Sequence, residues 1–392
     1  MDHSVAIVGV GEVRHGRFPD RPSLEMALDV SGQAIAHAGL EAREIDAVLI
    51  APAFADTAFN TDMAFGRLVE ELGMRNSAKI VMQVGAGGST GDRLLRTARG
   101  LIASGQARYV LCVHADKFTE LTKNEILEFF AVAGFDTEFE APYGVTYNTI
   151  AGLSAQRYLY ETGQTEYAIA DMTSSLREWG SLDVHASGYG KPMTTEQVLA
   201  TPILQWPIRT AMAPPPADGA SAFVVAGAED AKALRDSAAY VIAESSRVRT
   251  YSFTQHDDIT KMGWAESADE AFAEAGITRD QVGIAQFYMA YPIFHLILLE
   301  EFGFCERGRA GEFVASGATR PGGRLPVMTT GDAIGHGHTG SGVGVATLVD
   351  TARQLMGESG GRQVDDLEFV VETSCGGSYM DTNVVIFGRE PR

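Results

Sequence analysis

The chain has 392 residues, of which 45% are hydrophobic and 43 are glycines, a composition ordinary for a compact α/β enzyme of one large domain or two fused ones. A formal net charge of -20 argues against nonspecific nucleic-acid binding, because Lys and Arg must displace phosphate counterions in such complexes. The sequence has no run of about 18 apolar residues, the length that a membrane-spanning helix needs. We therefore expect a cytoplasmic protein that binds neither nucleic acid nor membrane.

The three cysteines, Cys112, Cys305 and Cys375, lie far apart, and none belongs to a CxxC motif. This pattern predicts neither a disulfide framework nor a structural zinc site, and it is typical of a reducing compartment. We expect no metal-ligand cluster in this chain.

The first half of the sequence alternates predicted strands and helices. Residues 79–84 and 109–114 are short, rich in β-branched residues and flanked by helical patterns, which suits a sheet covered on both faces. A glycine-rich segment, residues 85–88, follows the first of these strands and opens a helix. A strand at 221–226 and a helix at 229–237 are expected to close this half.

Residues 117–205 interrupt the alternation. Helices are predicted at 150–162 and 165–179, joined by loops rich in Gly, Tyr and Pro. We interpret this segment as a lid-like insertion that covers the site. Tyr143 and Tyr147 belong to it, and either substrate contact or simple packing fits their positions.

The second half repeats the first. Residues 34–54 match residues 271–291 without a gap, and each copy reads as a helix, an acidic connector and a strand. The chain is thus predicted to fold as two pseudo-symmetric halves, 1–237 and 238–392.

A second alignment sets residues 97–99 on residues 351–353. It places Gly85 opposite Thr339, so that two glycine-rich loops begin equivalent helices. A further strand is predicted at 368–372.

Several short motifs follow one another in a specific order: Val8-Gly9-Val10-Gly11, Pro142-Tyr143-Gly144, Asp218-Gly219-Ala220, Leu298-Leu299-Glu300-Glu301-Phe302-Gly303-Phe304-Cys305, Gly337-His338 and Cys375-Gly376-Gly377. Because it contains these motifs in this order, the chain resembles the thiolase superfamily over nearly its full length. It is most similar to the sterol-carrier-type thiolases and the thiolase-like aldolases that shorten steroid side chains. The resemblance implies the α/β thiolase fold, with five layers arranged α-β-α-β-α, a coenzyme A thioester as substrate and no tightly bound cofactor.

The resemblance is incomplete at the catalytic positions. The position of the thiolase nucleophilic cysteine holds Gly85, so acyl transfer through this residue is chemically impossible. Tyr288 aligns with an Asn or His of thiolases and matches the tyrosine of the aldolases. His338 keeps the histidine of the Gly-His-Pro loop, where the aldolases have a second tyrosine. Cys375 occupies the place of the final acid/base cysteine.

Cleaving the bond between a thioester α-carbon and a carbinol carbon needs a base, enolate stabilisation and a proton donor. Tyr288, His338 and Cys375 are the candidates for these roles. The start of the glycine-led helix offers amide groups and a dipole to an oxygen or an anion. The candidate substrate and coenzyme A contacts are Gly85, Gly87, Gly88, Ser89, Tyr143, Gly337, Gly340 and Gly376. Packing remains an alternative for Tyr288, in an aromatic strand, and for Cys375, since free cysteines are commonly inert.

Three functions remain open. The first is an aldolase or retro-aldolase for a bulky β-hydroxyacyl-CoA. The second is a thiolase or acyltransferase that uses Cys375, and the third is a non-catalytic subunit of a heteromeric complex.

The resemblance also implies a homodimer that pairs through residues 79–84. Similar proteins often need a small companion with a zinc ribbon and an oligonucleotide-binding (OB) type barrel. Either such a partner or local cations such as Lys191, Arg209 and Arg324 would offset the negative charge for an anionic substrate.

Overall fold

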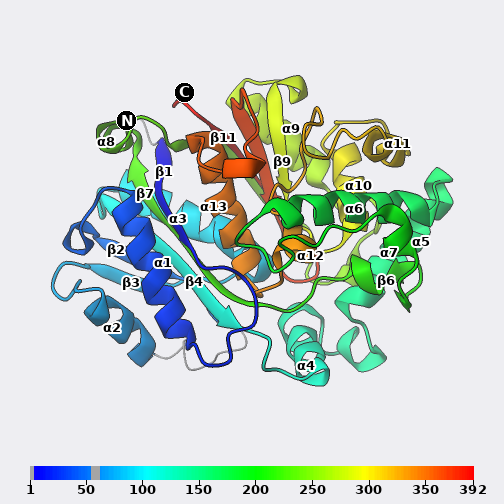
Figure 1. Cartoon of the computed structure of the whole chain (residues 1–392), viewed down its shortest axis with the longest axis horizontal. Coiled ribbons are helices and arrows are strands. Elements are labelled where there is room, and N and C mark those ends of the chain that lie inside the picture. Colours follow the sequence, from blue (N-terminus) through cyan, green and yellow to red (C-terminus); the bar gives the residue numbers. More distant parts are fainter. Residues whose placement is uncertain (1–3, 54–61) are drawn as a thin grey trace.

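The computed structural model describes residues 4–53 and 62–392 (Figure 1). Phe54, the last residue of the first repeat copy, lies outside the described residues. Within the described parts, none of the helices combines the length and the apolar character needed to cross a bilayer.

The two halves contain the strands and helices that the periodicity predicts. The first half contains β1 (Val5–Glu12), α1 (Ser23–His37), β2 (Ala47–Ile50), α2 (Asp62–Glu71), β3 (Ile80–Gln83), α3 (Thr90–Ala103), β4 (Tyr109–Lys117), β7 (Asp218–Gly227) and α8 (Ala228–Leu234). The second half contains β8 (Ala239–Val248), α9 (Trp264–Ala275), β9 (Val282–Phe287), α10 (Pro292–Glu301), α11 (Ala310–Ala315), α12 (Asp332–His336), α13 (Gly342–Met356), β10 (Phe369–Ser374) and β11 (Asp381–Gly388).

The segment between β4 and β7 is largely helical. It contains α4 (Lys123–Gly134), α5 (Tyr147–Thr162), α6 (Glu166–Leu182), α7 (Thr195–Leu199), β5 (Ile203–Gln205) and β6 (Ile208–Arg209). Local sequence sets its helix ends. Thr122 and Glu125 form a capping box at the start of α4, and α5 ends at Gly163, whose φ of 70° favours glycine.

The strands form one sheet in the order β3-β2-β4-β7-β1-β8-β11-β10-β9. β2 and β4 pair in parallel and β4 and β7 antiparallel, while in the second half β9 and β10 pair in parallel and β10 and β11 antiparallel. Apart from the additional edge strand β3, the order β2-β4-β7-β1 of the first half therefore mirrors the order β8-β11-β10-β9 of the second. The halves join where Ala6 and Ile7 of β1 face Tyr240 and Ala239 of β8. This topology confirms the internal repeat, because α1 and β2 occupy the place that α9 and β9 occupy in the second half.

The five layers pack through two outer apolar cores and one central apolar core, which contains α3 and α13. Alternate side chains of the first-half strands face an outer core with α1, and alternate side chains of the second-half strands face an outer core with α9 and α10. The remaining strand side chains meet α3 and α13 in a central core. Figure 1 shows α3 and α13 in the middle of the molecule and α1 on the outer face of the first-half strands. The predicted five-layered thiolase fold is confirmed.

The two central helices approach closely at glycines. A β-carbon on Gly91 of α3 would lie 2.8 Å from the carbonyl carbon of Gly344 in α13. The glycine-rich loops that begin these helices therefore lie next to each other, as the second repeat alignment predicts.

The insertion is anchored to the second half. Trp179 of α6 donates its indole N–H to the Thr319 carbonyl at 2.8 Å, and the Tyr158 hydroxyl of α5 donates to Glu300 at 2.5 Å. α6 thereby becomes part of the second-half core. The boundary at residue 237 stays a prediction.

Candidate active site

A cavity of about 730 Å³ lies where the strand ends of both halves meet the insertion. Its walls are mainly apolar and aromatic, including Phe118, Ile126, Leu127 and Phe130 from the insertion. A cavity of this volume is within the range of small-molecule sites.

The cavity brings together seven of the eleven predicted site residues. Tyr288, His338, Cys375, Gly85, Gly87, Gly88 and Gly340 line it. They come from both glycine-rich loops and from the ends of β9 and β10, which are far apart in the sequence.

The backbone at Gly85 lies against Pro52. A β-carbon built on Gly85 would lie 2.7 Å from the Pro52 Cγ, closer than carbon atoms approach without a shift. Gly88 is equally restricted, since its β-carbon would lie 2.3 Å from the Cys375 carbonyl oxygen. The glycines thus allow the start of α3 to approach the Cys375 turn, and the structure leaves little room for a side chain at residue 85.

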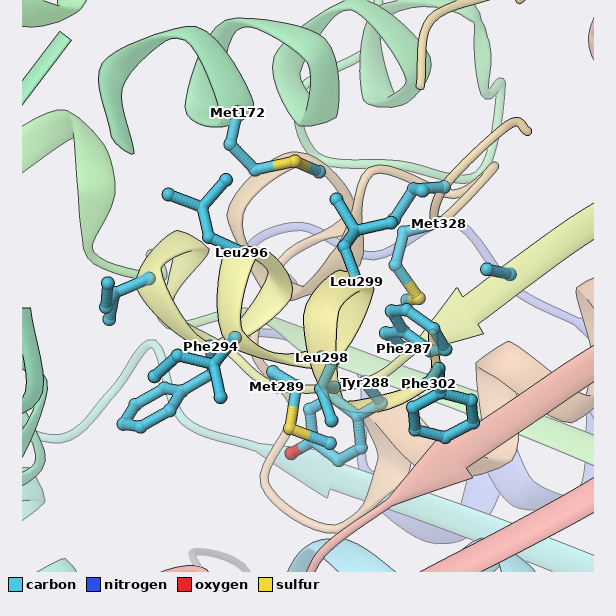
Figure 2. Packing of buried hydrophobic residues seen from close by; sticks show 14 of the residues in the cluster. Met172, Phe287, Tyr288, Met289, Phe294, Leu296, Leu298, Leu299, Phe302 and Met328 are labelled. Atoms are coloured by element: carbon cyan, nitrogen blue, oxygen red, sulfur yellow. The ribbon is translucent and has the colours of Figure 1, made fainter. Parts of the chain in front are cut away.

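Tyr288 follows β9, and its backbone N–H donates to the Thr373 carbonyl at 3.0 Å. Its ring packs below α10, on the opposite side of that helix from Met172 (Figure 2). Its hydroxyl donates to the Gly340 carbonyl at 3.4 Å, beside the cavity. Burial, followed by Asp332 and Cys375, raises the pKa of this phenol well above its ordinary value. The Tyr288 ring is therefore part of the hydrophobic core, and its hydroxyl is a neutral group at the site.

His338 is held as a hydrogen-bond donor. The Gly340 amide donates to its Nδ1 at 3.2 Å, which leaves the proton of the neutral ring on Nε2. Phe118 and Phe130 pack edge-on against the ring, and burial lowers the pKa of His338 to about 4. A neutral imidazole with a free N–H suits an oxyanion site.

Cys375 lies at the end of β10, and 9% of its surface is exposed. Burial raises its pKa well above the usual value, and the carboxylates of Asp381, Asp332 and Asp92 add to this effect. At neutral pH the group is a thiol, which keeps a proton to donate but is a weak nucleophile.

Four predicted contacts lie outside the cavity lining: Ser89, Tyr143, Gly337 and Gly376. Tyr143 is 79% exposed, so the motif around it marks a surface turn. Ser89 is buried and donates to Asp381 at 2.8 Å, and Gly376 N–H donates to the same carboxylate oxygen at 2.5 Å. These two residues connect the start of α3 to the Cys375 turn and position the site indirectly.

Three further tyrosines line the cavity: Tyr147, for which the sequence left contact or packing open, and Tyr291 and Tyr379, which were not among the predicted site residues. The Tyr147 hydroxyl donates to the Gly377 carbonyl at 2.8 Å, Tyr291 to Asn148 at 2.6 Å and Tyr379 to the Met289 carbonyl at 2.9 Å. Tyr147 begins α5, four residues after Tyr143 of the Pro142-Tyr143-Gly144 motif, and it lines the cavity, whereas Tyr143 does not.

The expectation of no metal site stays a prediction, but the structure brings together three residues of metal-binding type that the sequence did not indicate. Glu12, His15 and His336 place ligand atoms within 4.8 Å of one another, all buried. The long separation along the chain conceals this cluster, because the fold alone brings β1 next to α12.

The chain is similar to known proteins over nearly its full length. Residues 245–389 match the family described as thiolase C-terminal domain-like. The chain is 27% identical to acetyl-CoA acetyltransferase of Methanothermobacter thermautotrophicus, over 98% of this chain and 99% of that protein. It is 28% identical to 17-hydroxy-3-oxo-4-pregnene-20-carboxyl-CoA lyase of Mycobacterium tuberculosis, over 99% and 100% of the two chains.

Among solved structures, the Ltp2-ChsH2(DUF35) aldolase superposes with a TM-score of 0.83 at 25% identity, covering 99% of this chain and 98% of that chain. The proteins named here are thus an acetyltransferase, a lyase and an aldolase. The chain therefore shares the thiolase fold, matches a thiolase C-terminal domain-like family over residues 245–389 and is similar over nearly its whole length to the enzymes named here.

Proposed function

We propose that the protein makes or breaks a carbon-carbon bond next to a coenzyme A thioester without an acyl-cysteine, as an aldolase or retro-aldolase for a bulky β-hydroxyacyl-CoA. One observation carries the proposal. Gly85 is pressed against Pro52, while Tyr288, His338 and Cys375 face the same cavity. A lyase relative with similarity over the whole chain supports the same reaction class.

The reaction balances without a covalent intermediate. In cleavage, the β-hydroxyl loses its proton, the bond between the α- and β-carbons breaks, and its electron pair forms the thioester enolate as a ketone or aldehyde leaves. Protonation of the α-carbon then gives the shortened acyl-CoA. Each step needs one proton transfer, and condensation is the reverse.

Each of the three polar side chains has one role in this scheme. The His338 Nε2–H donates to the thioester oxygen and stabilises the enolate. Tyr288 transfers the proton of the β-oxygen. In cleavage its phenolate removes the proton from the β-hydroxyl, and in condensation its phenol protonates the alkoxide. Cys375, as a neutral thiol, protonates the α-carbon.

The cavity supports a bulky acyl group. A volume of about 730 Å³ with aromatic walls greatly exceeds the needs of an acetyl group. Lys123 is a cationic lining residue at the start of α4 and is exposed, which suits the anionic part of coenzyme A.

Acyl transfer through Cys375 is the second candidate, and the acetyltransferase relative favours it. The burial of the thiol and the three carboxylates that raise its pKa oppose it, because the thiolate is the nucleophile. A non-catalytic subunit is the third candidate, and for it the polar residues in the cavity would be dispensable.

We also propose two kinds of partner. β3 is an edge strand, with Val81 36% exposed, and is the candidate contact in a homodimer. The structural neighbour is a complex with ChsH2, described as DUF35, and a small zinc-ribbon and OB-type companion is the corresponding partner here.

Intact-protein mass spectrometry tests the reaction. The protein is incubated with acyl-CoA and β-hydroxyacyl-CoA thioesters, and the small-molecule products are separated. An aldehyde or ketone product with no mass added to the protein is expected. An acyl adduct on Cys375 would contradict the aldolase and support the acyltransferase, and the experiment is repeated with a co-expressed companion if the chain alone is inactive.

A further inference from the structure

A second group of polar side chains lies behind the His338 loop. Glu12 ends β1, His15 follows three residues later, and His336 ends α12. Their exposed fractions are 5%, 1% and 1%, and their ligand atoms all lie within 4.8 Å of one another. The proposed carbon-carbon chemistry uses none of these residues.

Neighbouring residues orient two of the three ligands. The Nδ1 of His336 lies 3.2 Å from the Asp183 Oδ2, which leaves its Nε2 facing the Glu12 Oε1 at 3.1 Å. The other Glu12 oxygen accepts from Arg353 at 2.5 Å. A carboxylate on the far nitrogen of a histidine is the arrangement that orients imidazole ligands toward metal ions.

His15 provides the independent observation. Its Nε2 lies 3.9 Å from the Glu12 Oε1, and its ring meets the His336 ring edge-on with centroids 4.1 Å apart. Among the described residues, neither ring nitrogen of His15 has a hydrogen-bond partner of ordinary geometry. A buried ring nitrogen without a partner lowers stability, and a cation bound between the three residues would satisfy it.

We propose that Glu12, His15 and His336 bind one divalent transition-metal ion, of which Zn²⁺ is the best match. Two imidazoles and a carboxylate are a donor set that zinc accepts in four-coordinate sites. The ion connects the end of β1 to α12 and, through Asp183, to the insertion, so it stabilises the loop that carries His338. The His185 side chain, 28% exposed, lies 3.7 Å from the Glu12 Oε2.

A proton competes with the metal ion for the same lone pair. Burial opposes protonation of His336, yet Asp183 and Glu12 raise its pKa to about 9. A protonated ring would bridge the two carboxylates in place of a metal ion. The experiment must therefore measure metal directly.

The test uses the full chain, stripped with a chelator, incubated with Zn²⁺ and desalted. Elemental analysis is expected to give about one Zn²⁺ per chain, Co²⁺ is expected to give ligand-field absorption bands, and Zn²⁺ is expected to raise the melting temperature. His15→Gln, which keeps a polar side chain of similar size, is expected to abolish all three signals. Asp183→Asn is expected to weaken binding about 10- to 100-fold.

The matched control is His37→Gln, because His37 is a half-buried histidine of α1 that pairs with Glu358 and is not one of the three proposed ligands. It is expected to bind Zn²⁺ like the unmodified chain. Failure of the unmodified chain to retain Zn²⁺ or Co²⁺ would overturn the proposal, whether or not the variants fold, and so would binding that His15→Gln leaves intact. None of these measurements depends on the reaction proposed above.

Discussion

Gly85 and Pro52 are in contact, and a β-carbon on Gly85 would lie 2.7 Å from the proline ring. The thiolase-like loop therefore has a shape adapted to glycine. A cysteine at residue 85 would require the proline to move, so replacement of this side chain alone is not expected to give an acyl-transfer site.

Gly85→Cys is accordingly expected to lower the free energy of unfolding by about 1–3 kcal/mol, the usual effect of overpacking. Urea denaturation measures this effect, and adding Pro52→Ala is expected to recover part of it. Gly100→Cys is the matched control, since Gly100 lies in α3 and has nothing within 4 Å of its β-carbon position. Equal unfolding free energies for Gly85→Cys and the control would contradict the steric argument.

Tyr288→Phe is expected to lower kcat for cleavage about 10²- to 10⁴-fold, because it removes the hydroxyl proposed to exchange the β-oxygen proton. The ring stays packed below α10, so the melting temperature is expected to change little (Figure 2). Steady-state kinetics and thermal denaturation check both statements. Tyr240→Phe, a buried tyrosine of β8 outside the cavity lining, is the control and is expected to keep full activity. Full activity of Tyr288→Phe would remove this residue from the mechanism.

The cleavage rate is expected to rise with pH. In the proposed mechanism Tyr288 acts as a phenolate in this direction. Its pKa is raised above the ordinary value for tyrosine, so below that pKa each pH unit increases the active fraction about tenfold. Rates measured from neutral to mildly alkaline pH, with substrate saturating, give the slope. Tyr288→Phe is expected to lose this slope. A flat profile for the unmodified protein, with chemistry shown to limit the rate, would assign the proton transfer to another group.

Cys375 is expected to resist alkylation. Burial and three nearby carboxylates raise its pKa, so at pH 8 iodoacetamide is expected to modify it at least about tenfold more slowly than a cysteine of ordinary pKa. Peptide mapping identifies the modified residue, and the urea-unfolded chain gives the reference rate. Rapid modification of Cys375 in the folded protein, increasing little between pH 7 and pH 9, would instead indicate a thiolate and favour acyl transfer.

The local pattern of residues was sufficient to predict much of the fold. Short β-branched runs predict β3, β4 and β10, and the match of residues 34–54 with 271–291 predicts two equivalent halves. Both signals depend on contacts close in sequence, such as strand alternation and helix ends. The resemblance added Tyr288, His338 and Cys375, which the structure places around one cavity.

Packing between segments far apart in the sequence decided which further residues lie at the cavity and which lie together behind it. Tyr147 reaches the site because α5 packs on the second half, and Tyr143, four residues earlier, faces solvent. Glu12 meets His336 because β1 lies beside α12, more than 300 residues later in the chain. The sequence by itself determined the strands, the helices and the repeat, since short segments encode them. The cavity, the pKa values and the group of Glu12, His15 and His336 depend on burial and on distances between remote segments. Only the tertiary structure decided these three features.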